Sequence, residues 1–332
     1  MKINADIGVI KMTYNIKLIV KVASLYYKDQ LNQEEIAKKL KVSKYQVNRI
    51  LKKALDSGIV QITIIDPSTG VSNLEDQMEK RFELKRAIVI ENSGLSDVEL
   101  KSKLGAAASD YLQEIIKDGD IIGVSWGTTV NEVINHLPSR INKEVQVVQI
   151  TGGSHQLSVD LNCHDLTRRL AKRFEVEPHL LYAPALLDSK ELYNLLMHEK
   201  SIRSTFDYFD KVTIALCGIG SIFPNIMSCI ISTGEINDAD FKGLKEKGAV
   251  GDIFSYFFDE SGKICDTDLK DRIFSIPVDT LKKVPYSIGV AGGKIKAEAM
   301  LGALRGKFVN ILITDDTAAK RMLELETGKN LR

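Results

Sequence analysis

The chain from Ala87 to Asp315 alternates short apolar runs with longer segments of helical spacing, and several of the apolar runs end in glycine. The runs with strand character are AIVI, DIIGVSW, VQVVQITGG, HLLYAPAL, KVTIALCGIGSI, SIGVAGG and VNILITD. The segments with helical spacing between them are LKSKLGAAASDYLQEII, VNEVINHL, LTRRLAKRF and KIKAEAMLGALRG. Because apolar strands that alternate with helices are typical of crossover connections, the sequence predicts an α/β fold with a doubly wound, mostly parallel sheet.

In a sheet of this kind, small ligands bind beyond the carboxyl ends of the strands, at the loops that open the next helices. The loops of this type are residues 123–129 (GVSWGTT), 151–153 (TGG), 218–221 (GIGS) and 292–296 (GGKIK). In the first loop, Gly127 permits a tight turn, after which Thr128 and Thr129 offer hydroxyl and N–H groups to a phosphate at a helix N-terminus. In the fourth loop, Lys296 lies where it can meet an anion. Each loop alone is ordinary turn punctuation, but together they predict a polar, phosphorylated small ligand.

Common cofactor motifs do not fit these loops. A dinucleotide fingerprint requires G-x-G-x-x-G, and Phe223 stands where the third glycine would follow Gly218 and Gly220. The sequence also lacks the lysine motif of a P-loop. His155 and His164 lie near each other in the sequence, but no helix face carries two histidines at ligand spacing. We therefore expect no NAD, no ATP and no metal ion.

A second feature, from Asn15 to Ile65, has the outline of a winged helix-turn-helix. Asn32, followed three residues later by Glu35, predicts a capped helix over Gln33 to Leu40. The alternation from Ile59 to Ile64 predicts the strand of a wing. The first helix precedes this pair, and its expected inner face carries Ile16, Ile19, Val20, Ala23 and Tyr27.

The third helix of this segment is the predicted reading helix. We expect Ser43 to cap it and Gly58 to end it. Its expected buried residues are Val47, Ile50, Leu51 and Leu55. Its expected DNA-binding residues are Ser43, Lys44, Tyr45, Gln46, Asn48, Arg49 and Lys52. Asn, Gln and Arg can pair bidentately with base edges, whereas Lys and Tyr can contact phosphates.

The distribution of charge supports a DNA-binding segment. Residues 1–66 hold 12 of the 45 basic residues and 6 of the 44 acidic ones, so this segment carries +6 and the remainder −5. A nearly neutral chain has thus concentrated positive charge on a small segment, as contact with DNA phosphates requires. The alternative is a charged helical hairpin that mediates contacts between subunits.

The predicted domain boundary is the turn cluster Asp66-Pro67-Ser68-Thr69-Gly70. We expect a DNA-binding domain over 1–66 and a ligand-binding and oligomerisation domain over 67–332, with residues 67–86 as a linker helix. This helix carries an apolar stripe of Val71, Leu74, Met78 and Phe82, which either covers the large domain or pairs with a second subunit. Since winged modules usually act in pairs on two half-sites, a dimer is one expectation.

Bulk properties place the chain among globular proteins. It has 332 residues, with 44% hydrophobic and 27% charged residues, enough for two domains. The sequence has no apolar run of the length that a spanning helix needs, and its first residues do not resemble a signal peptide. Four widely spaced cysteines without a CxxC pair are typical of reduced thiols in a cytoplasmic protein.

Five sequence segments resemble those of the SorC family of bacterial transcription regulators in order and spacing. They are IGVSWGTT, VVQITGG, LCGIGSI, GAVGDIFSYFFD and IGVAGGKIKAEAMLGALRGKFVNILITD. The resemblance covers nearly the whole chain from about Asn15. It implies an N-terminal winged helix-turn-helix and a sugar-phosphate effector domain similar to glucosamine-6-phosphate deaminase and ribose-5-phosphate isomerase. It also implies a homodimer or homotetramer on a palindromic DNA operator, with a phosphorylated sugar altering the affinity for DNA.

The resemblance also assigns the effector-binding residues. They are Ser125, Gly127, Thr128, Thr129, Gly152, Gly218, Gly220, Asp252, Phe254, Gly292 and Lys296. The glycine and threonines at 127–129 would hold the phosphate with Lys296, and Asp252 and Phe254 would meet sugar hydroxyls. Some members of the family have a basic residue where Thr151 stands, and threonine can neither bind a second phosphate as a cation nor form a Schiff base. This departure argues against a bisphosphate or a covalent sugar adduct at Thr151.

A second hypothesis is an isomerase or deaminase that carries a DNA-binding head. Such an enzyme needs a general base and a proton shuttle near the first carbons of the sugar. Asp252 can serve as a base, but the sequence offers no partnered histidine or glutamate for the shuttle. A regulator without catalytic activity therefore explains these residues with fewer assumptions.

Overall fold

The computed structural model describes residues 16–60 and 69–328. The chain divides into two compact units at Pro67 and Ser68, and each unit is described by itself. Residues 61–64 of the predicted wing strand, and the predicted boundary residues at 66–68, lie outside the described ranges.

The described residues of the first unit form the helices α1 (Ile16–Tyr27), α2 (Gln33–Leu40) and α3 (Lys44–Asp56). The predicted cap of α2 is confirmed: the Asn32 side chain accepts hydrogen bonds from two backbone N–H groups, and Glu35 Oε2 accepts one from Asn32 N at 2.8 Å. The predicted cap of α3 is confirmed as well, because Ser43 Oγ accepts a hydrogen bond from Gln46 N.

The buried faces of α1 and α3 differ in part from the prediction. In α1, Ile19, Val22 and Ala23 are buried, whereas Ile16 is 69% exposed, and Val20 and Tyr27 are also exposed. In α3, Val47, Ile50 and Leu51 are buried as expected, but Ala54 is buried in place of Leu55. Each of the two helices contains more than one set of apolar residues spaced three and four apart, and these sets share members. The packing of the helices against one another decides which set is buried.

The second unit is built on a six-stranded sheet with the order β1-β9-β8-β4-β2-β3. All five neighbouring pairs of strands are parallel. The strands are β1 (Arg86–Ile90), β2 (Ile121–Val124), β3 (Gln146–Gln149), β4 (Ile214–Gly218), β8 (Tyr286–Val290) and β9 (Ile311–Asp315). The predicted parallel sheet is therefore confirmed.

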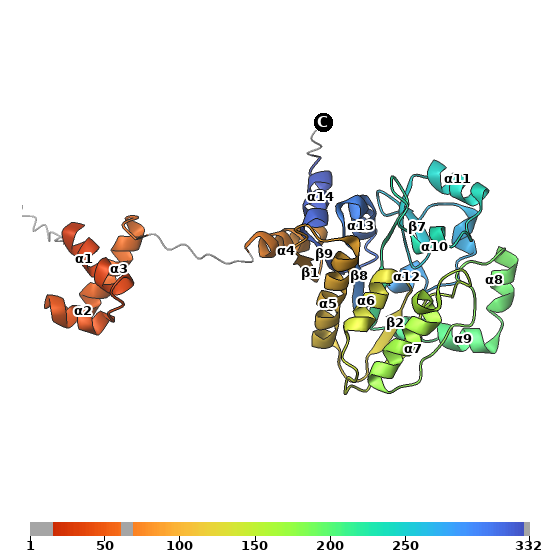
Figure 1. Ribbon diagram of the computed structural model, residues 1–332, viewed down its shortest axis with the longest axis horizontal. Coiled ribbons are helices and arrows are strands. Elements are labelled where there is room, and N and C mark those ends of the chain that lie inside the picture. The colour runs from red at the N-terminus through yellow and green to blue at the C-terminus, as the bar shows by residue number, and fades with distance from the viewer. Residues whose placement is uncertain (1–15, 61–68, 329–332) are drawn as a thin grey trace, which may run out of the picture. The chain divides into compact units, whose positions relative to one another are not determined.

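Helices cover both faces of this sheet (Figure 1). One face carries α5 (Asp97–Ile115), α6 (Thr128–His136) and α7 (Cys163–Phe174), and the other carries α4 (Thr69–Phe82), α13 (Ala297–Arg305) and α14 (Asp316–Glu326). Alternate strand residues point to opposite faces: in β4, Ile214 and Leu216 join the first core, and Ala215 and Cys217 join the second. Because the inner strands β2, β4, β8 and β9 are buried on both sides, their sequences are nearly continuous apolar runs, as the doubly wound prediction requires.

Several elements extend this framework. A small antiparallel sheet holds β5 (Gly220–Ser221), β6 (Ala249–Ile253) and β7 (Tyr256–Asp259). The remaining α-helices are α8 (Lys190–Leu196), α9 (Lys200–Phe206), α10 (Cys229–Ser232), α11 (Asp238–Glu246) and α12 (Val278–Leu281). Short 3₁₀ helices lie at Val159–Leu161, Phe209–Lys211, Asp268–Asp271 and Lys294–Lys296.

The predicted strand HLLYAPAL is wrong in detail. Residues 179–186 form isolated bridges to Val148, Gly153 and Ile273 rather than a continuous strand. His179 N donates to Val147 O, and Gln149 N donates to His179 O, each at 2.9 Å. The segment therefore covers the outer edge of β3 without becoming a seventh strand.

The opposite edge of the sheet is covered by α4. Glu79 Oε1 accepts a hydrogen bond from Ala87 N, and Glu75 Oε1 accepts one from Val89 N, both at 2.9 Å. These two N–H groups belong to β1, the edge strand, and would otherwise be unpaired. The apolar stripe of α4 packs on the same unit, where Leu74 and Met78 are buried. This packing favours the first of the two alternatives for the stripe.

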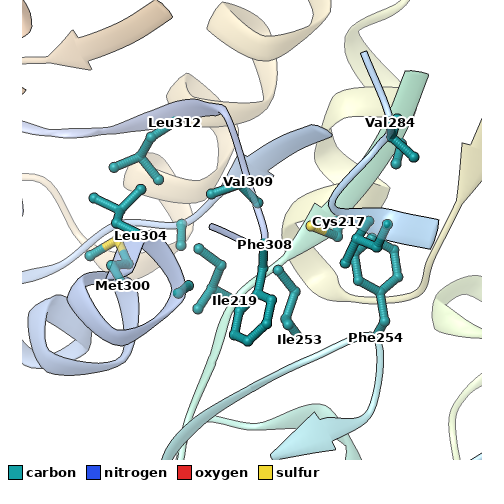
Figure 2. Packing of buried hydrophobic residues seen from close by; sticks show 14 of the residues in the cluster. Cys217, Ile219, Ile253, Phe254, Val284, Met300, Leu304, Phe308, Val309 and Leu312 are labelled. Carbon is teal, nitrogen blue, oxygen red and sulfur yellow. The ribbon is translucent and has the colours of Figure 1, made fainter. Parts of the chain in front are cut away.

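Figure 2 shows the core on the α13 side of the sheet. Phe308 lies at its centre, with Ile219 and Ile253 beside it and Met300 and Leu304 from α13 nearby. Ile219 and Ile253 each adjoin a predicted site residue in the sequence. The loop after β4 and the end of β6 are thus anchored by the apolar core.

Candidate functional site

The site lies where the sheet changes the direction of its connections. The connection from β2 leads to β3 on one side, whereas the connection from β4 leads, through the small sheet, to β8 on the other. Such a reversal leaves a crevice at the carboxyl ends of the two strands. A pocket of about 450 Å³ opens there, lined by Ser125, Trp126, Gly127, Thr128, Thr129, Gly218, Ile219, Gly220, Met227, Cys229, Asp252, Phe254 and Lys296.

One wall of the pocket is the N-terminus of α6. Gly127 is the N-cap residue and has φ +130°, a conformation that favours glycine. Gly127 has no side chain with which to cap this helix, so N–H groups of its first turn can bind a ligand, although the Thr128 backbone also interacts with the Cys229 thiol. Those groups and the helix dipole favour an anion.

The position of α6 depends on a glycine in the neighbouring helix. A Cβ atom at Gly105 of α5 would lie 2.7 Å from the backbone carbonyl carbon of Glu132 in α6. The absence of a side chain at Gly105 therefore permits the close approach of the two helices. Through this contact α5 helps to place the N-terminus of α6 at the pocket.

Lys296 brings a positive charge to the pocket. Its side chain is buried, and Nζ donates a hydrogen bond to the carbonyl oxygen of Ile219 at 3.3 Å. Burial lowers the pKa of this ammonium group. A ligand anion would restore some of the solvation that the buried charge has lost.

Asp252 brings a carboxylate to the same pocket. It lies on β6 opposite Gly220 of β5, where a Cβ atom would come within 2.0 Å of Asp252 Oδ1. Burial raises the pKa of Asp252 to about 6, although the Ser228 hydroxyl and the Lys296 charge act in the opposite direction. In the described residues Oδ1 is buried without a hydrogen-bond partner. A buried oxygen of this kind can accept a ligand hydroxyl.

Gly152 and Gly292 do not line this pocket. A Cβ atom at Gly152 would lie 2.4 Å from Pro184 O, and one at Gly292 would lie 2.6 Å from a methyl carbon of Leu104. Both glycines therefore permit close packing, which is an alternative use of glycine at strand ends. The sequence does not distinguish a glycine that faces a ligand from one that faces another segment.

The expected contact of Phe254 with sugar hydroxyls is not supported by its side-chain position. The residue borders the pocket, but it is only 2% exposed and its ring belongs to the apolar core (Figure 2). A phenyl ring also has no group that hydrogen-bonds a hydroxyl in the usual sense. We therefore assign Phe254 to the floor beneath the pocket.

Four lining residues are absent from the sequence prediction: Trp126, Ile219, Met227 and Cys229. Trp126 and Ile219 lie inside the predicted loops, so their position in the sequence could have identified them as lining residues. Met227 and Cys229 come from the segment before and within α10, where no motif marks them. The pKa of the Cys229 thiol is raised mainly by burial and further by the charge of Asp252.

Thr151 is fully buried beside the pocket. Its hydroxyl lies 2.9 Å from Ser275 Oγ and donates to Ser125 Oγ at 3.4 Å. The hydroxyl thus has partners within the protein and carries no charge.

In the first unit, the predicted DNA-binding residues follow one face of α3. Lys44, Asn48, Arg49 and Lys52 are exposed, and Tyr45 is 74% exposed. Lys44 Nζ also pairs with Glu34 of α2 at 2.7 Å, an exposed contact of small energy. Ser43 and Gln46 are engaged in the helix cap, where Gln46 Oε1 accepts a hydrogen bond from Ser43 N. The Gln46 amide still has its NH₂ group for a base or phosphate.

Among residues 16–60 and 69–328, no group of three or more His, Cys, Asp and Glu side chains is arranged to hold a metal ion. In the same ranges, no helix is both long and apolar enough to cross a membrane.

Comparison with known proteins relates both units to transcription regulators. Residues 66–324 match a family described as "Putative sugar-binding domain". The sorbitol operon regulator of Klebsiella pneumoniae is 34% identical over 312 residues, which cover 93% of this chain and 98% of that protein. The deoxyribonucleoside regulator of Bacillus subtilis is 31% identical, with 92% and 97% covered. The crystal structure of the full-length Klebsiella regulator is similar with a TM-score of 0.74, covering 93% of this chain and 99% of that chain.

Proposed function

The chain belongs to the SorC family of transcriptional regulators, and from that membership we propose that a phosphorylated sugar in the pocket between β2 and β4 controls its binding to operator DNA. Its relatives are named as regulators of a sorbitol operon and of deoxyribonucleosides. The chain is a DNA-binding transcriptional regulator of this kind, with a sugar-binding domain.

The observation that carries the proposal is the pairing of two cationic features in one pocket. The N-terminus of α6, whose N-cap residue is a glycine, and the side chain of Lys296 both line the same space. A phosphate monoester carries a charge of about −1.5 to −2 at neutral pH, so it matches both features. Asp252 then accepts hydroxyl groups of the sugar.

For the first unit, we propose that α3 enters the major groove. Asn48 and Arg49 would contact base edges, and Lys44, Tyr45 and Lys52 would contact phosphates. Residues 1–66 would form the DNA-binding domain and residues 67–332 the effector domain. Two or four copies of the chain would act together on a palindromic operator, in the cytoplasm where that operator lies.

The pocket would bind its ligand without catalysis. Enolisation of a sugar phosphate needs a base and a partner that returns the proton, and Asp252 is the sole lining residue among the described ones with a suitable carboxylate. Incubation of the protein with aldose phosphates should leave them unchanged by NMR. Turnover at a useful rate would instead favour an isomerase or deaminase with a DNA-binding head.

The single tryptophan of the chain provides a direct test, because Trp126 lines the pocket. We expect its fluorescence to change on titration with a panel of sugar monophosphates and not with the corresponding free sugars. Operator-binding assays with the active ester then test control of DNA affinity, since an effector must bind the two states of the protein with different affinity.

Lys296→Ala should weaken binding of the active phosphate ester by roughly 10-fold or more, since a charge-assisted hydrogen bond contributes about 1.5–3 kcal/mol. Binding of the dephosphorylated sugar should change much less. Lys294→Ala, at an exposed neighbour, is the matched control. Equal losses for the ester and the free sugar would remove the phosphate assignment.

A further inference from the structure

A second pocket lies beyond the carboxyl end of β3, next to the segment that covers this strand. Its open volume is about 680 Å³, and we name it the Tyr182 pocket after one of its lining residues. The lining groups that carry its chemistry are Ser154, His155, His164, Tyr182, Pro184 and Glu235. It shares no lining residue with the pocket between β2 and β4.

The carboxylate of Glu235 is the main hydrogen-bond acceptor of the Tyr182 pocket. Its Oε1 accepts a hydrogen bond from Ser154 Oγ at 2.5 Å and lies 3.4 Å from His155 Nδ1. Its Oε2 is buried, and within the described ranges it has no hydrogen-bond partner. An unpaired buried oxygen is unfavourable, so a hydrogen-bond donor from a ligand would stabilise this side chain.

The Tyr182 ring provides an apolar surface for the same ligand. Tyr182 is 66% exposed, although a tyrosine in a folded protein usually buries most of its ring. Its ring centre lies 5.6 Å from that of His164, and Pro184 continues the surface. The pKa of His164 is lowered mainly by burial and further by the charge of Arg168. Its imidazole is therefore neutral at neutral pH.

The described residues that line the Tyr182 pocket offer an anion no cationic side chain. No lysine or arginine is among its described lining residues, and Glu235 contributes a negative charge. The pocket between β2 and β4 is different, because it holds Lys296 and the N-terminus of α6. A ligand for the Tyr182 pocket should therefore be uncharged, rich in hydroxyl donors and able to place C–H groups on an aromatic ring. A sugar ring has all three properties, and a flexible polyol can adopt a conformation that provides them.

We infer that the Tyr182 pocket binds the hydroxyl groups of a sugar or polyol, with donors directed at Glu235 and C–H groups on the Tyr182 ring. This inference rests on the proposed function in taking the domain to be a sugar-binding one. Two sources have this chemistry: a separate unphosphorylated sugar, or the hydroxylated end of the phosphate ester held by Lys296. The loops of the two pockets are joined by hydrogen bonds from Thr151 to Ser125 and from Cys163 to Val124.

The test uses isothermal titration of the full-length chain with D-glucose, D-sorbitol, D-ribose and their terminal phosphate esters. Glu235→Gln and Tyr182→Ala should each weaken binding of the active probe by about 10-fold, the effect of about 1.4 kcal/mol. Tyr182→Phe keeps the ring and should retain the affinity. Glu246→Gln, at an exposed carboxylate of α11, is the matched control, and near-ultraviolet circular dichroism verifies the fold of each variant.

Two outcomes support the inference and identify the source. A free polyol that binds Lys296→Ala normally but not Glu235→Gln is a separate ligand. A phosphate ester whose affinity falls in both variants occupies the two pockets at once. Two outcomes overturn the inference: loss in Lys296→Ala alone, with Glu235→Gln and Tyr182→Ala as wild type, which leaves the proposed function intact, or no binding of any probe, which contradicts both.

Discussion

The carboxyl group of Asp252 is buried in the pocket and changes protonation near neutral pH. Burial raises its pKa from 3.8 to about 6. Between these values the folded chain binds more protons than the unfolded chain, so the free energy of unfolding falls as pH rises. Above about pH 6 the ionisation of Asp252 has lowered the free energy of unfolding by its full amount, which is on the order of 3 kcal/mol for a pKa shift of this size.

Asp252→Asn should therefore flatten the pH dependence of stability between about pH 4 and pH 6. Urea unfolding of wild type and variant across this range measures the difference. Asp238→Asn, at an exposed aspartate of α11, should leave the wild-type slope unchanged. If Asp252→Asn also keeps the wild-type slope, a group other than Asp252 causes the pH dependence of stability in this range.

The turn between β6 and β7 places two ordinary residues in an unfavourable backbone conformation. Phe254 and Ser255 have φ values of +50° and +68°, as the first and second residues of a two-residue hairpin with positive φ at both positions require. Ser255 Oγ is also buried and has no partner in the described residues. The strain is located at the end of the strand that carries Asp252, as is common at binding sites.

Ser255→Gly should raise the free energy of unfolding by about 1 kcal/mol, because glycine adopts positive φ without a steric penalty. Differential scanning calorimetry measures the shift. Ser204→Gly in α9, a helical position, should instead lower stability by about 0.5–1 kcal/mol. Destabilisation by both variants would show that the strain at Ser255 is smaller than the entropy cost of glycine.

At the scale of elements, α5 and α6 are coupled by the contact at Gly105. Gly105→Ala should lower the free energy of unfolding by about 1–2 kcal/mol, because overpacking outweighs the helix propensity of alanine. It should also weaken binding of the active phosphate ester, since α6 must shift. Gly243→Ala in α11 is the control: the nearest atom to its added Cβ would be 3.8 Å away, so this variant should be stabilised by about 1 kcal/mol. Equal behaviour of the two variants in urea unfolding would contradict the role of Gly105.

The elements of this fold could be predicted from sequence to the extent that local patterns determine them. The parallel strands appeared as apolar runs because both faces of the sheet are buried, and the caps at Asn32 and Ser43 are local hydrogen-bond patterns. The pairing of β5 with β6 in the small sheet could not be predicted in the same way, because it joins segments that are distant in sequence. Residues 179–186 have the composition of a strand, but only their tertiary neighbours limit them to isolated bridges.

The candidate site could also be predicted only where local sequence patterns mark its residues. The loops after β2 and β4 adjoin long apolar runs, so the sequence places them at one edge of the sheet. Met227, Cys229 and Glu235 reach their pockets through the irregular segment around α10, where sequence periodicity carries no information. Whether a glycine lines a pocket, as Gly218 does, or packs against another backbone, as Gly152 does, depends on contacts between distant segments.

At the scale of the whole molecule, recognition of DNA and of the effector are assigned to different units. Arg49→Ala should weaken operator binding by about 1–3 kcal/mol if it contacts a base. The Trp126 fluorescence response to the active ester should remain that of wild type. Electrophoretic mobility shift and fluorescence titration of one preparation measure both properties. Equal loss of both would mean that α3 is not the reading helix.

Both lateral edges of the large sheet are closed by the chain itself, β1 by the carboxylates of α4 and β3 by residues 179–184. A second chain therefore cannot join by continuing the sheet, which is the least selective way for strands to associate. At these two edges, a contact with a second copy would instead run through side chains, whose complementarity differs from one sequence to another. For related regulators on the same framework, the side chains at these edges would then decide which copies can associate there.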